Sequence, residues 1–362
     1  MSRSSTIAII GTVGVPANYG GFETLVENLI CHHDSLSLND NLTVYCSSKS
    51  YSKKEKSYLS AQLKYIPLNA NGVQSIPYDI FSLFSAVWNR SDVILLLGVS
   101  GAIILPIIRL ISSARIITNI DGIEWRREKW KGFAGFFLHF SEKMAVRFSH
   151  EVISDNVAIS GYVKESYGVE NHVIAYGGDH AVSVETVSVD EYNLPEKYGF
   201  SVCRIEPENN IHVILDAFSE QNDYSLVIVG NWSKSDYGRE LRKKYMDFPN
   251  LFLLDPVYDL GKLKSLRSRA AVYIHGHSAG GTNPSLVEAM HFGVPIIAFD
   301  CDFNRSTTED KALFFRDAES LQHALDTLTE DVSENIGKEM IEIAQRRYTW
   351  GKVAENYFDH FK

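Results

Sequence analysis

Apolar runs and amphipathic stretches alternate along the first half of the chain. The short apolar runs predict buried strands, and the amphipathic stretches between them predict helices. The first strand is expected at residues 7–10, before a helix that begins at Phe22 and ends near Cys31. Further strands are expected at residues 42–46, 64–66, 93–97, 115–119 and 151–154. This rhythm predicts an α/β fold with a mostly parallel sheet and helices on both faces.

The same pattern begins again after residue 180. Residues 182–192 are polar and turn-like, and we interpret them as a linker between two domains. Strands are expected at residues 200–203, 225–229, 251–254, 271–275 and 295–299, and helices at 211–219, 236–246, 260–267 and 319–328. Residues 333–361 predict two helices with a bend near Tyr348. We therefore expect domains at residues 1–185 and 186–345, followed by a C-terminal helix at 346–362.

One stretch of the second half combines a strand, a glycine-rich loop and a helix start. Asn283 is a favourable N-cap, and Pro284 suits the first helical position because its missing N–H is not needed there. Such a helix start attracts anions, of which phosphate is the usual one. Glu288 lies one turn further along, where a carboxylate can accept hydrogen bonds from a ribose diol. The pattern indicates a nucleotide site, with a glycine turn that serves packing alone as the alternative.

Composition and charge narrow the class of protein. The chain has 362 residues, 45% hydrophobic and 22% charged, which is ordinary for two globular domains. Residues 1–180 contain 16 basic and 16 acidic side chains, whereas residues 181–362 contain 19 and 29, a net charge of −10. No domain is strongly basic, which argues against nucleic acid as a partner. The four cysteines are scattered and are expected to be reduced thiols of a cytoplasmic protein.

Neither the first residues of the chain nor its apolar runs predict export or a membrane span. The first residues pass directly into a strand, without the pattern of a signal peptide. The longest uncharged run, residues 93–108, is shorter than the roughly 20 residues of a membrane span. We interpret this run as a strand, a turn and a packed helix.

The glycine-rich loop after the first strand differs from a dinucleotide-binding loop. Its glycines do not follow the G-x-G-x-x-G pattern, and no ribose-binding carboxylate follows the second strand. The glycines still predict a loop that lets the backbone approach a ligand closely, with Tyr19 and Glu23 beside it. Two interpretations of Glu23 stay open, a ligand contact and a solvated acid favoured by the helix dipole.

Residues 119–130 combine carboxylates, an aromatic ring and guanidinium groups after another strand. Asp121 and Glu124 suit sugar hydroxyls, Trp125 suits an apolar sugar face, and Arg126 suits phosphate. The alternative is a surface helix start with internally paired charges. The longer stretch 125–147 is basic and aromatic, which fits either an anionic membrane surface or a core helix with a solvated edge.

The second half offers further candidates at its expected strand ends. Arg204 follows the first strand of this half, where it can reach a diphosphate, and Val257 follows another, where a nucleobase can lie against the main chain. His275 and His277 lie at the end of the strand before the glycine loop. Two roles stay open for each of them, contact with a ligand and termination of the strand alone.

One pattern in this half matches a metal-binding motif. Asp300 and Asp302 form a D-x-D pair, which is common by chance. Because Arg204 and a helix start already serve the phosphate, and no histidines are spaced i, i+4, we expect no metal.

Together these motifs resemble the GT-B-fold retaining glycosyltransferases of family four, and within them the bacterial rhamnosyltransferase-like group of polysaccharide synthesis. The resemblance spans essentially the whole chain and rests on GTVGVPANYGGFETLVENL, DGIEWRREKW, CRIEPENN and GHSAGGTNPSLVEAMHFGVPIIAF. It implies two doubly wound Rossmann-like domains that face a cleft. The closing YTWGKVAENYF looks like the terminal helix that crosses back to the first domain in this fold.

The resemblance also implies roles for single residues. Glu288 corresponds to the second Glu of the family's E-x7-E motif, which holds the ribose, whereas the first Glu of that motif falls on Gly280. Arg204 matches the diphosphate arginine, and the lysine usual five residues later is Asn209. These two departures suggest an unusual donor such as a deoxysugar nucleotide.

The expected function is retaining transfer of L-rhamnose from dTDP-L-rhamnose to a lipid-linked saccharide on the cytoplasmic face of the membrane, with no cofactor besides the donor. Catalytic roles fall to Asp121, Arg204 and Glu288. The expected donor contacts are Gly20, Gly21, Arg204, Asn209, Val257, His277, Gly280, Gly281, Thr282, Asn283 and Glu288. The expected acceptor contacts are Tyr19, Glu23, Glu124, Trp125 and Arg126. The alternatives are an enzyme for another donor or an epimerase on the same fold, and a non-catalytic nucleotide-binding subunit.

Overall fold

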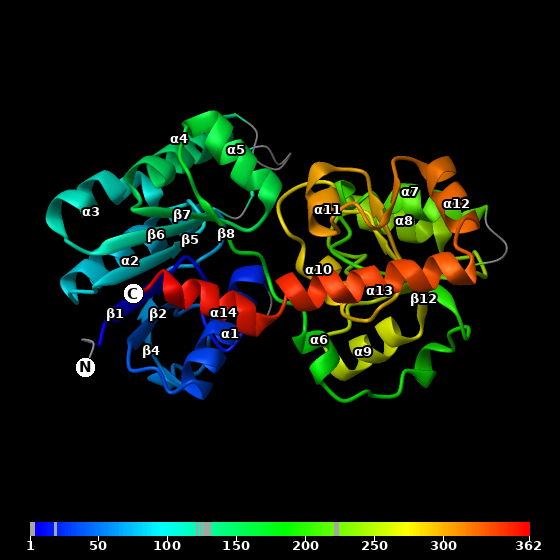
Figure 1. The fold of residues 1–362 in the computed structure, drawn as a ribbon, viewed down its shortest axis with the longest axis horizontal. Helices are drawn as coiled ribbons and strands as arrows, with labels where there is room; N and C mark the ends of the chain where they lie inside the picture. Colours follow the sequence, from blue (N-terminus) through cyan, green and yellow to red (C-terminus); the bar gives the residue numbers. More distant parts are fainter. Residues whose placement is uncertain (1–3, 18–19, 121, 124, 126–131, 221–223) are drawn as a thin grey trace. The chain divides into compact units, whose positions relative to one another are not determined.

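The computed structural model describes residues 4–17, 20–120, 122–123, 125, 132–220 and 224–362. The chain divides into two compact units (Figure 1), of which the first comprises Met1–Tyr176 and Trp350–Lys362 and the second Gly177–Thr349. Residues 177–185, which the sequence analysis assigned to the first domain, therefore belong to the second unit.

The first unit is built on a sheet whose described strands run in the order β3-β4-β2-β1-β5-β6-β7-β8. Neighbouring strands are parallel, except that β3 pairs antiparallel with β4. The strands are β1 (Thr6–Ile10), β2 (Asn41–Ser47), β3 (Ser57–Tyr58), β4 (Ala61–Ile66), β5 (Val93–Leu97), β6 (Arg115–Ile120), β7 (Glu151–Ser154) and β8 (His172–Val173). The unbroken apolar sequence of β5 reflects burial on both faces of the sheet.

Helices cover both faces of this sheet. They are α1 (Gly21–Ser35), α2 (Ser75–Trp88), α3 (Leu105–Ile111), α4 (Phe133–Phe148), α5 (Val157–Tyr167) and α14 (Trp350–Asp359), with short 3-10 turns at Gly72–Gln74 and Ala102–Ile104. The right-handed crossover places α1 on the face opposite α2, α3 and α4, because the chain moves along the sheet in opposite directions through them.

The C-terminal helix α14 completes the first unit by packing against α1 (Figure 1). The ring of Phe358 meets the ring of His33 edge to face, with centroids 6.0 Å apart. The side-chain amide of Asn119, at the end of β6, donates to the hydroxyl of Tyr357. The expected return of the last helix to the first domain is therefore confirmed.

The second unit is built on a sheet whose described strands run in the order β11-β10-β9-β12-β13-β14, all parallel. The strands are β9 (Tyr198–Val202), β10 (Leu226–Val229), β11 (Leu251–Leu254), β12 (Ala270–His275), β13 (Ile296–Phe299) and β14 (Leu313–Phe315). The helices are α6 (His180–Ser183), α7 (Ile211–Ser219), α8 (Asp236–Tyr245), α9 (Leu260–Ser268), α10 (Pro284–Met290), α11 (Asp302–Thr307), α12 (Ala318–Asp326) and α13 (Glu330–Arg347), with 3-10 turns at Asp190–Tyr192 and Pro207–Asn209.

Residues 182–192 are not the linker that their polar composition predicts. The ammonium group of Lys264, on α9, donates to the carbonyl groups of Val182 and Val184, at 2.9 Å each. The hydroxyl of Ser265 donates to the carbonyl of Val187 at 2.6 Å. The polar segment is thus fastened along α9 by its backbone carbonyls, which its side-chain composition does not reveal.

Strand order identifies one edge of each sheet as a place for ligands. Strand order reverses at β1 and β5 in the first unit and at β9 and β12 in the second. Ligands of open parallel sheets bind beyond the carboxyl ends of the strands at such points. The described segments found there are residues 11–17 after β1, 203–210 after β9 and 276–283 after β12.

Candidate functional site

The helix start after β12 has the geometry that the sequence predicts. Asn283 is the N-cap of α10, and its Oδ1 accepts hydrogen bonds from the backbone N–H of Ser285 at 3.0 Å and from the Ser285 hydroxyl at 2.8 Å. Pro284 occupies the first turn, where a missing N–H costs nothing. The order strand, glycine loop, capped helix is therefore confirmed in the second unit.

Glu288, on α10, is held by two partners, Arg267 and His180, that the sequence does not predict. Its Oε2 is bonded to a guanidinium nitrogen of Arg267, from α9, and its Oε1 lies 3.4 Å from Nε2 of His180, from α6. The side chains of Arg267 and Glu288 are only 5% and 16% exposed. No local pattern could have identified these partners, because they come from two other helices.

The pKa of Glu288 depends on its burial and on its two partners. Burial alone would raise the pKa of Glu288, but Arg267 and His180 outweigh burial and lower that pKa below its ordinary value. Glu288 is therefore an anion at neutral pH. A carboxylate in this state is an acceptor only, which suits neutral hydroxyl donors.

Arg204 lies after β9, at the sheet edge where the sequence analysis expects it. Its guanidinium group is 3.5 Å from a carboxylate oxygen of Glu206 and 3.7 Å from one of Glu208. The Arg204 side chain is 36% exposed. These contacts are longer than charge-assisted hydrogen bonds. The two carboxylates therefore neutralise the charge of Arg204 but do not hold its side chain tightly.

Asn209 and His277 join the loops after β9 and β12. The Asn209 side chain donates to the carbonyl of Arg204 at 2.7 Å, and its oxygen is 2.8 Å from Nδ1 of His277. Both side chains are buried. A Cβ at Gly276 would lie 2.1 Å from the Asn209 carbonyl oxygen, so only glycine permits this approach. Asn209, at the position where the resemblance implies a lysine, thus holds two site loops together.

The remaining donor candidates lie at various depths around these loops. His275 is buried, and burial lowers its pKa to about 3, so it ends β12 as a neutral ring. Thr282 is also buried, and Gly280 has a φ of 101°, a backbone conformation that favours glycine. Val257 follows β11, which is separated from β12 by β10 and β9.

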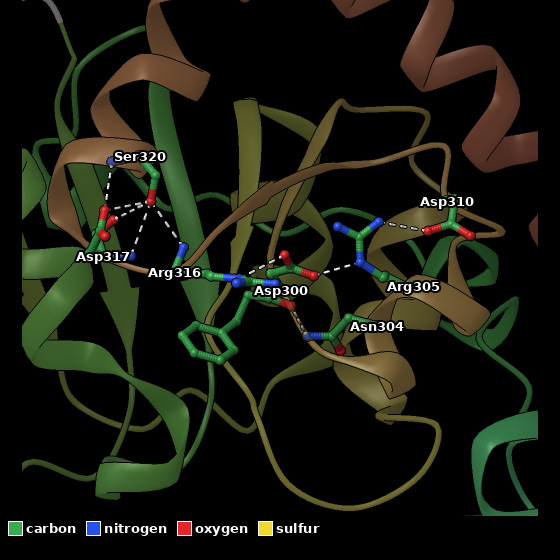
Figure 2. Close-up of polar contacts among 8 residues, drawn as sticks. Asp300, Asn304, Arg305, Asp310, Arg316, Asp317 and Ser320 are labelled. Carbon is green, nitrogen blue, oxygen red and sulfur yellow. Dashed lines mark hydrogen bonds and ion pairs between the residues drawn. The ribbon is translucent and has the colours of Figure 1, made fainter.

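Asp300, the first residue of the D-x-D pair, forms part of an ion-pair network (Figure 2). Asp300 accepts from Nε of Arg305 at 2.5 Å and from Nε of Arg316 at 2.9 Å. The hydrogen bond from Arg305 is the main reason why the pKa of Asp300 is lowered. Asp302 begins α11. The Asp300 carboxylate is thus bonded to two arginines. Asn304 of α11 donates to the carbonyl of His277 at 2.8 Å.

In the first unit, Glu23 closes the loop that follows β1. One oxygen of the buried Glu23 carboxylate accepts from the backbone N–H of Val13 at 2.7 Å and from the hydroxyl of Thr12 at 3.0 Å. Gly20 has a φ of 141°, and a Cβ there would collide with the same carboxylate. Gly21 begins α1. The interpretation of Glu23 as a solvated acid is therefore wrong, because the side chain bonds the loop instead.

Trp125 lies over a polar cluster between α4 and α5. Its ring stacks on that of His139 with centroids 4.4 Å apart, and its indole N–H is 3.4 Å from the hydroxyl of Tyr162. The hydroxyls of Tyr162 and Tyr167 each donate to the buried Glu142 at 2.6 Å. Tyr19, Asp121, Glu124 and Arg126, which the sequence analysis also singles out, lie outside the described residues.

Comparison with known families covers each unit separately. Residues 188–347 match the family described as Glycosyl transferases group 1. Residues 4–179 match the family described as Domain of unknown function (DUF1972). No curated protein is significantly similar to the chain in sequence.

Solved structures resemble the chain over nearly its whole length. A sucrose-phosphate synthase from Thermosynechococcus elongatus is 16% identical, with 99% of this chain and 98% of that chain covered and a TM-score of 0.80. HepE from Anabaena, in complex with UDP and glucose, is 14% identical, with 99% of each chain covered and a TM-score of 0.73. The α,α-trehalose 6-phosphate synthase from Burkholderia multivorans is 10% identical, with 99% and 96% covered and a TM-score of 0.74.

The two parallel-sheet, Rossmann-like halves and these neighbours identify the fold as GT-B. Residues 188–347, which include β9 to β14 and Glu288, form a glycosyl transferases group 1 domain. Fold and domain together define the class of the protein as a GT-B glycosyltransferase.

Proposed function

We propose that the chain transfers a sugar, with retention of configuration, from a nucleotide donor to a lipid-linked saccharide in cell-surface polysaccharide synthesis. The observation that carries the proposal is Glu288, an ionised carboxylate fixed by Arg267 and His180 within a group 1 glycosyltransferase domain. A fixed acceptor of this kind suits the two hydroxyls of a ribose. The complex of HepE with UDP and glucose supports a nucleotide as the ligand class.

In this proposal Arg204 binds the diphosphate of the donor. The phosphate oxygens of a diphosphate can form shorter, paired bonds with the guanidinium group than the 3.5 and 3.7 Å contacts of Glu206 and Glu208, so the diphosphate displaces them. Gly281, Thr282 and Asn283 contribute contacts from the loop and the helix start. The departing phosphate takes the proton of the acceptor hydroxyl, so no protein nucleophile is needed, and Asp121 orients that hydroxyl.

The first choice of donor is dTDP-L-rhamnose, a deoxysugar nucleotide. Gly280 offers no side chain where the family has its first Glu, and its φ of 101° disfavours any other residue. Asn209 offers no charge where the family has its lysine, and it is occupied with His277 and Arg204. A site with fewer polar groups for the sugar fits a sugar with fewer hydroxyls.

An exposed apolar and basic surface supports a membrane-bound acceptor. Helix α3 packs against both α2 and α4, and the three helices expose Trp88 (88%), Leu110 (85%) and Phe136 (68%). Arg109, Lys143 and Arg147 are also exposed on these helices, whereas their two acids, Asp79 and Glu142, are buried. Apolar side chains among cations suit the headgroup region of an anionic bilayer. Among the described helices none is long and apolar enough to cross a membrane.

A donor screen tests the nucleotide site. Thermal unfolding is measured with dTDP-L-rhamnose, UDP-glucose, UDP-GlcNAc, GDP-mannose and the free nucleotides, since a ligand at a hundred times its Kd stabilises by about 2.7 kcal/mol. We expect the largest shift with dTDP-L-rhamnose and a much smaller one in Glu288→Gln. A larger shift with another donor corrects the sugar, and no shift with any of them contradicts the nucleotide site.

Transfer of labelled sugar to membrane extracts tests the catalytic role of Arg204. Arg204→Ala is expected to lower kcat/KM by at least a hundredfold, because it removes charge stabilisation of the departing diphosphate. Arg239→Ala is the matched control, since Arg239 is an exposed, ion-paired arginine on α8 of the same unit. A loss within a few-fold for Arg204→Ala contradicts the diphosphate role.

A non-catalytic, nucleotide-binding subunit is the second candidate. It is favoured by Gly280 and Asn209, which replace two polar side chains of the family, and by the pairing of Arg204 with Glu206 and Glu208. Such a subunit would show the thermal shift without transfer. An epimerase would instead convert the nucleotide sugar with no acceptor present.

Vesicle co-sedimentation tests the membrane surface. Trp88→Ser together with Leu110→Ser is expected to reduce binding to anionic vesicles at least tenfold, because both side chains leave water on docking. Met246→Ser is the control, since Met246 is 61% exposed in the second unit. Equal binding by all three proteins contradicts this surface.

A further inference from the structure

Two histidines and a glutamate meet at the outer edge of the first sheet, in the first unit. Glu151 begins β7, His172 begins β8, and His360 follows α14 near the end of the chain. One nitrogen or carboxylate oxygen from each of the three lies within 4.8 Å of those of the other two. Their positions in the sequence are so far apart that no spacing pattern predicts the cluster.

Hydrogen bonds and packing fix two of the three side chains. Glu151 Oε2 is bonded to Nδ1 of His360, and Oε1 accepts from Nε of Arg115 at 2.9 Å. The rings of His172 and His360 lie with centroids 4.4 Å apart. His360 is followed by the buried Phe361, whose ring packs on Phe358 of α14. Glu151 and His360 are therefore positioned before any ligand binds.

The cluster opens to solvent through a pocket of about 370 Å³. His172 and His360 line it, together with the polar side chains of Asn171, Asn356 and Asp359. A pocket of this size has room for an ion with its remaining water ligands, and it provides a path by which the ion enters.

We propose that Glu151, His172 and His360 bind a divalent transition-metal ion, with Zn²⁺ as the first choice. Two imidazole nitrogens and one carboxylate oxygen are a ligand set that Zn²⁺ takes, with water in the fourth position. Zinc–ligand bonds of about 2.1 Å put tetrahedral ligand atoms about 3.4 Å apart. The ligand atoms all lie within 4.8 Å of one another, so small rotations of the two rings bring them to this separation.

The ion takes the place of the hydrogen bond between Glu151 and His360. Arg115 remains on the other carboxylate oxygen, Oε1, and keeps the carboxylate oriented. The bound ion ties the last residues of the chain to β7 and β8. Because α14 reaches the first unit only after the chain has passed through the whole second unit, the ion closes that long loop and stabilises the return of the chain.

Metal titration of the untagged, chelator-treated full chain tests the site. Isothermal titration with Zn²⁺ is expected to show one site per chain, and Co²⁺ to give the visible absorption of a nitrogen-bound, four-coordinate ion. His172→Ala and His360→Ala are expected to weaken Zn²⁺ binding at least tenfold. His323→Ala, an exposed histidine of α12 in the second unit, is expected to bind as the wild type does.

Folding of the variants is followed in the same samples. His172 is an exposed residue of an edge strand, so His172→Ala keeps the far-ultraviolet circular dichroism of the wild type. Zn²⁺ raises the Tm of the wild type and of His323→Ala, but not of His172→Ala. Absence of Zn²⁺ binding to the wild type, or equal binding by His172→Ala, overturns the proposal, and neither result depends on the glycosyltransferase activity.

Discussion

Both units contain a strand, a glycine-rich loop and a helix with a glutamate near its start, but the two glutamates have different partners. Glu23 follows β1 and accepts hydrogen bonds from Thr12 and Val13 of its own loop. Glu288 follows β12 and is held by Arg267 and His180, from two other helices. The Glu23 carboxylate holds its own loop in place, whereas the Glu288 carboxylate is held by side chains of two other helices.

This difference explains why similar sequence patterns carry different roles. The two bonds to Glu23 lie within eleven residues of the chain, so they form with the loop itself. The ion pair of Glu288 and Arg267 joins α10 to α9, which β12 separates in the sequence, and exists only after the second unit has folded. A carboxylate that depends on tertiary partners is the better candidate for a ligand contact, because its charge and direction are set in advance.

Of the changes that test this comparison, removal of Arg267 is expected to lower the free energy of unfolding most. Arg267→Met leaves the Glu288 anion buried without its main partner, and we expect a loss of about 3–5 kcal/mol in the free energy of unfolding. Urea unfolding at pH 7 measures the change. Arg316→Met is the matched control, because its pair with Asp300 has a 75% exposed arginine and is worth at most about 1 kcal/mol. Equal losses in the two variants would show that burial does not strengthen the Glu288 pair.

The pH dependence of stability sharpens the same contrast. The pKa of Glu288 is lowered in the folded protein, so its stabilising contribution is complete above the unfolded pKa of about 4.3 and is lost as the pH falls through the folded value. In Arg267→Met, burial raises that pKa against His180 alone, so the variant gains relative stability in acid. We expect the difference in the free energy of unfolding between wild type and variant to shrink between pH 7 and pH 4. A difference that stays constant over this range contradicts this account.

Truncating Glu23 tests the other half of the comparison. Glu23→Ala leaves the N–H of Val13 and the hydroxyl of Thr12 without their shared acceptor, and we expect a loss of about 1–3 kcal/mol. Urea unfolding gives the loss, and amide exchange at Val13 locates it. Glu23→Gln is the control, since its amide oxygen still accepts both bonds. If the two variants exchange equally fast at Val13, the carboxylate does not close the loop.

Most of the architecture could be predicted because its elements have strong local patterns. The apolar run of β5 and the cap at Asn283 are examples in which adjacent residues decide the structure. Strand β14, with three residues, and the polar helix α11 were missed because such short segments carry too little pattern. Residues 182–192 were misread since backbone carbonyls, which the side chains do not reveal, fasten them to α9.

The candidate site was predictable in position but not in its bonding. Arg204, Asn209 and His277 lie at the carboxyl ends of adjacent strands, as the alternation of strands and helices predicts. The pairing of Asn209 with His277 connects residues 68 positions apart, and the partners of Glu288 come from α6 and α9. Such contacts depend on how the helices pack on the sheet, which periodicity alone does not determine.

Placing at position 280, in the loop after β12, the glutamate that the resemblance implies is expected to have the smallest effect on stability and to bring no gain in function. Gly280→Glu places a side chain at a φ of 101°, which costs about 1–2 kcal/mol. Gly168→Glu, at a φ of 67° with no atoms within 4 Å of its Cβ, is the matched control for the backbone cost alone. Urea unfolding and donor titration are measured on both. We expect similar losses of stability in the two variants, but weaker donor binding only in Gly280→Glu, because its backbone must shift within the donor loop. Tighter binding by Gly280→Glu would instead show that the loop accepts the usual sugar contact, and that glycine there does not define the donor.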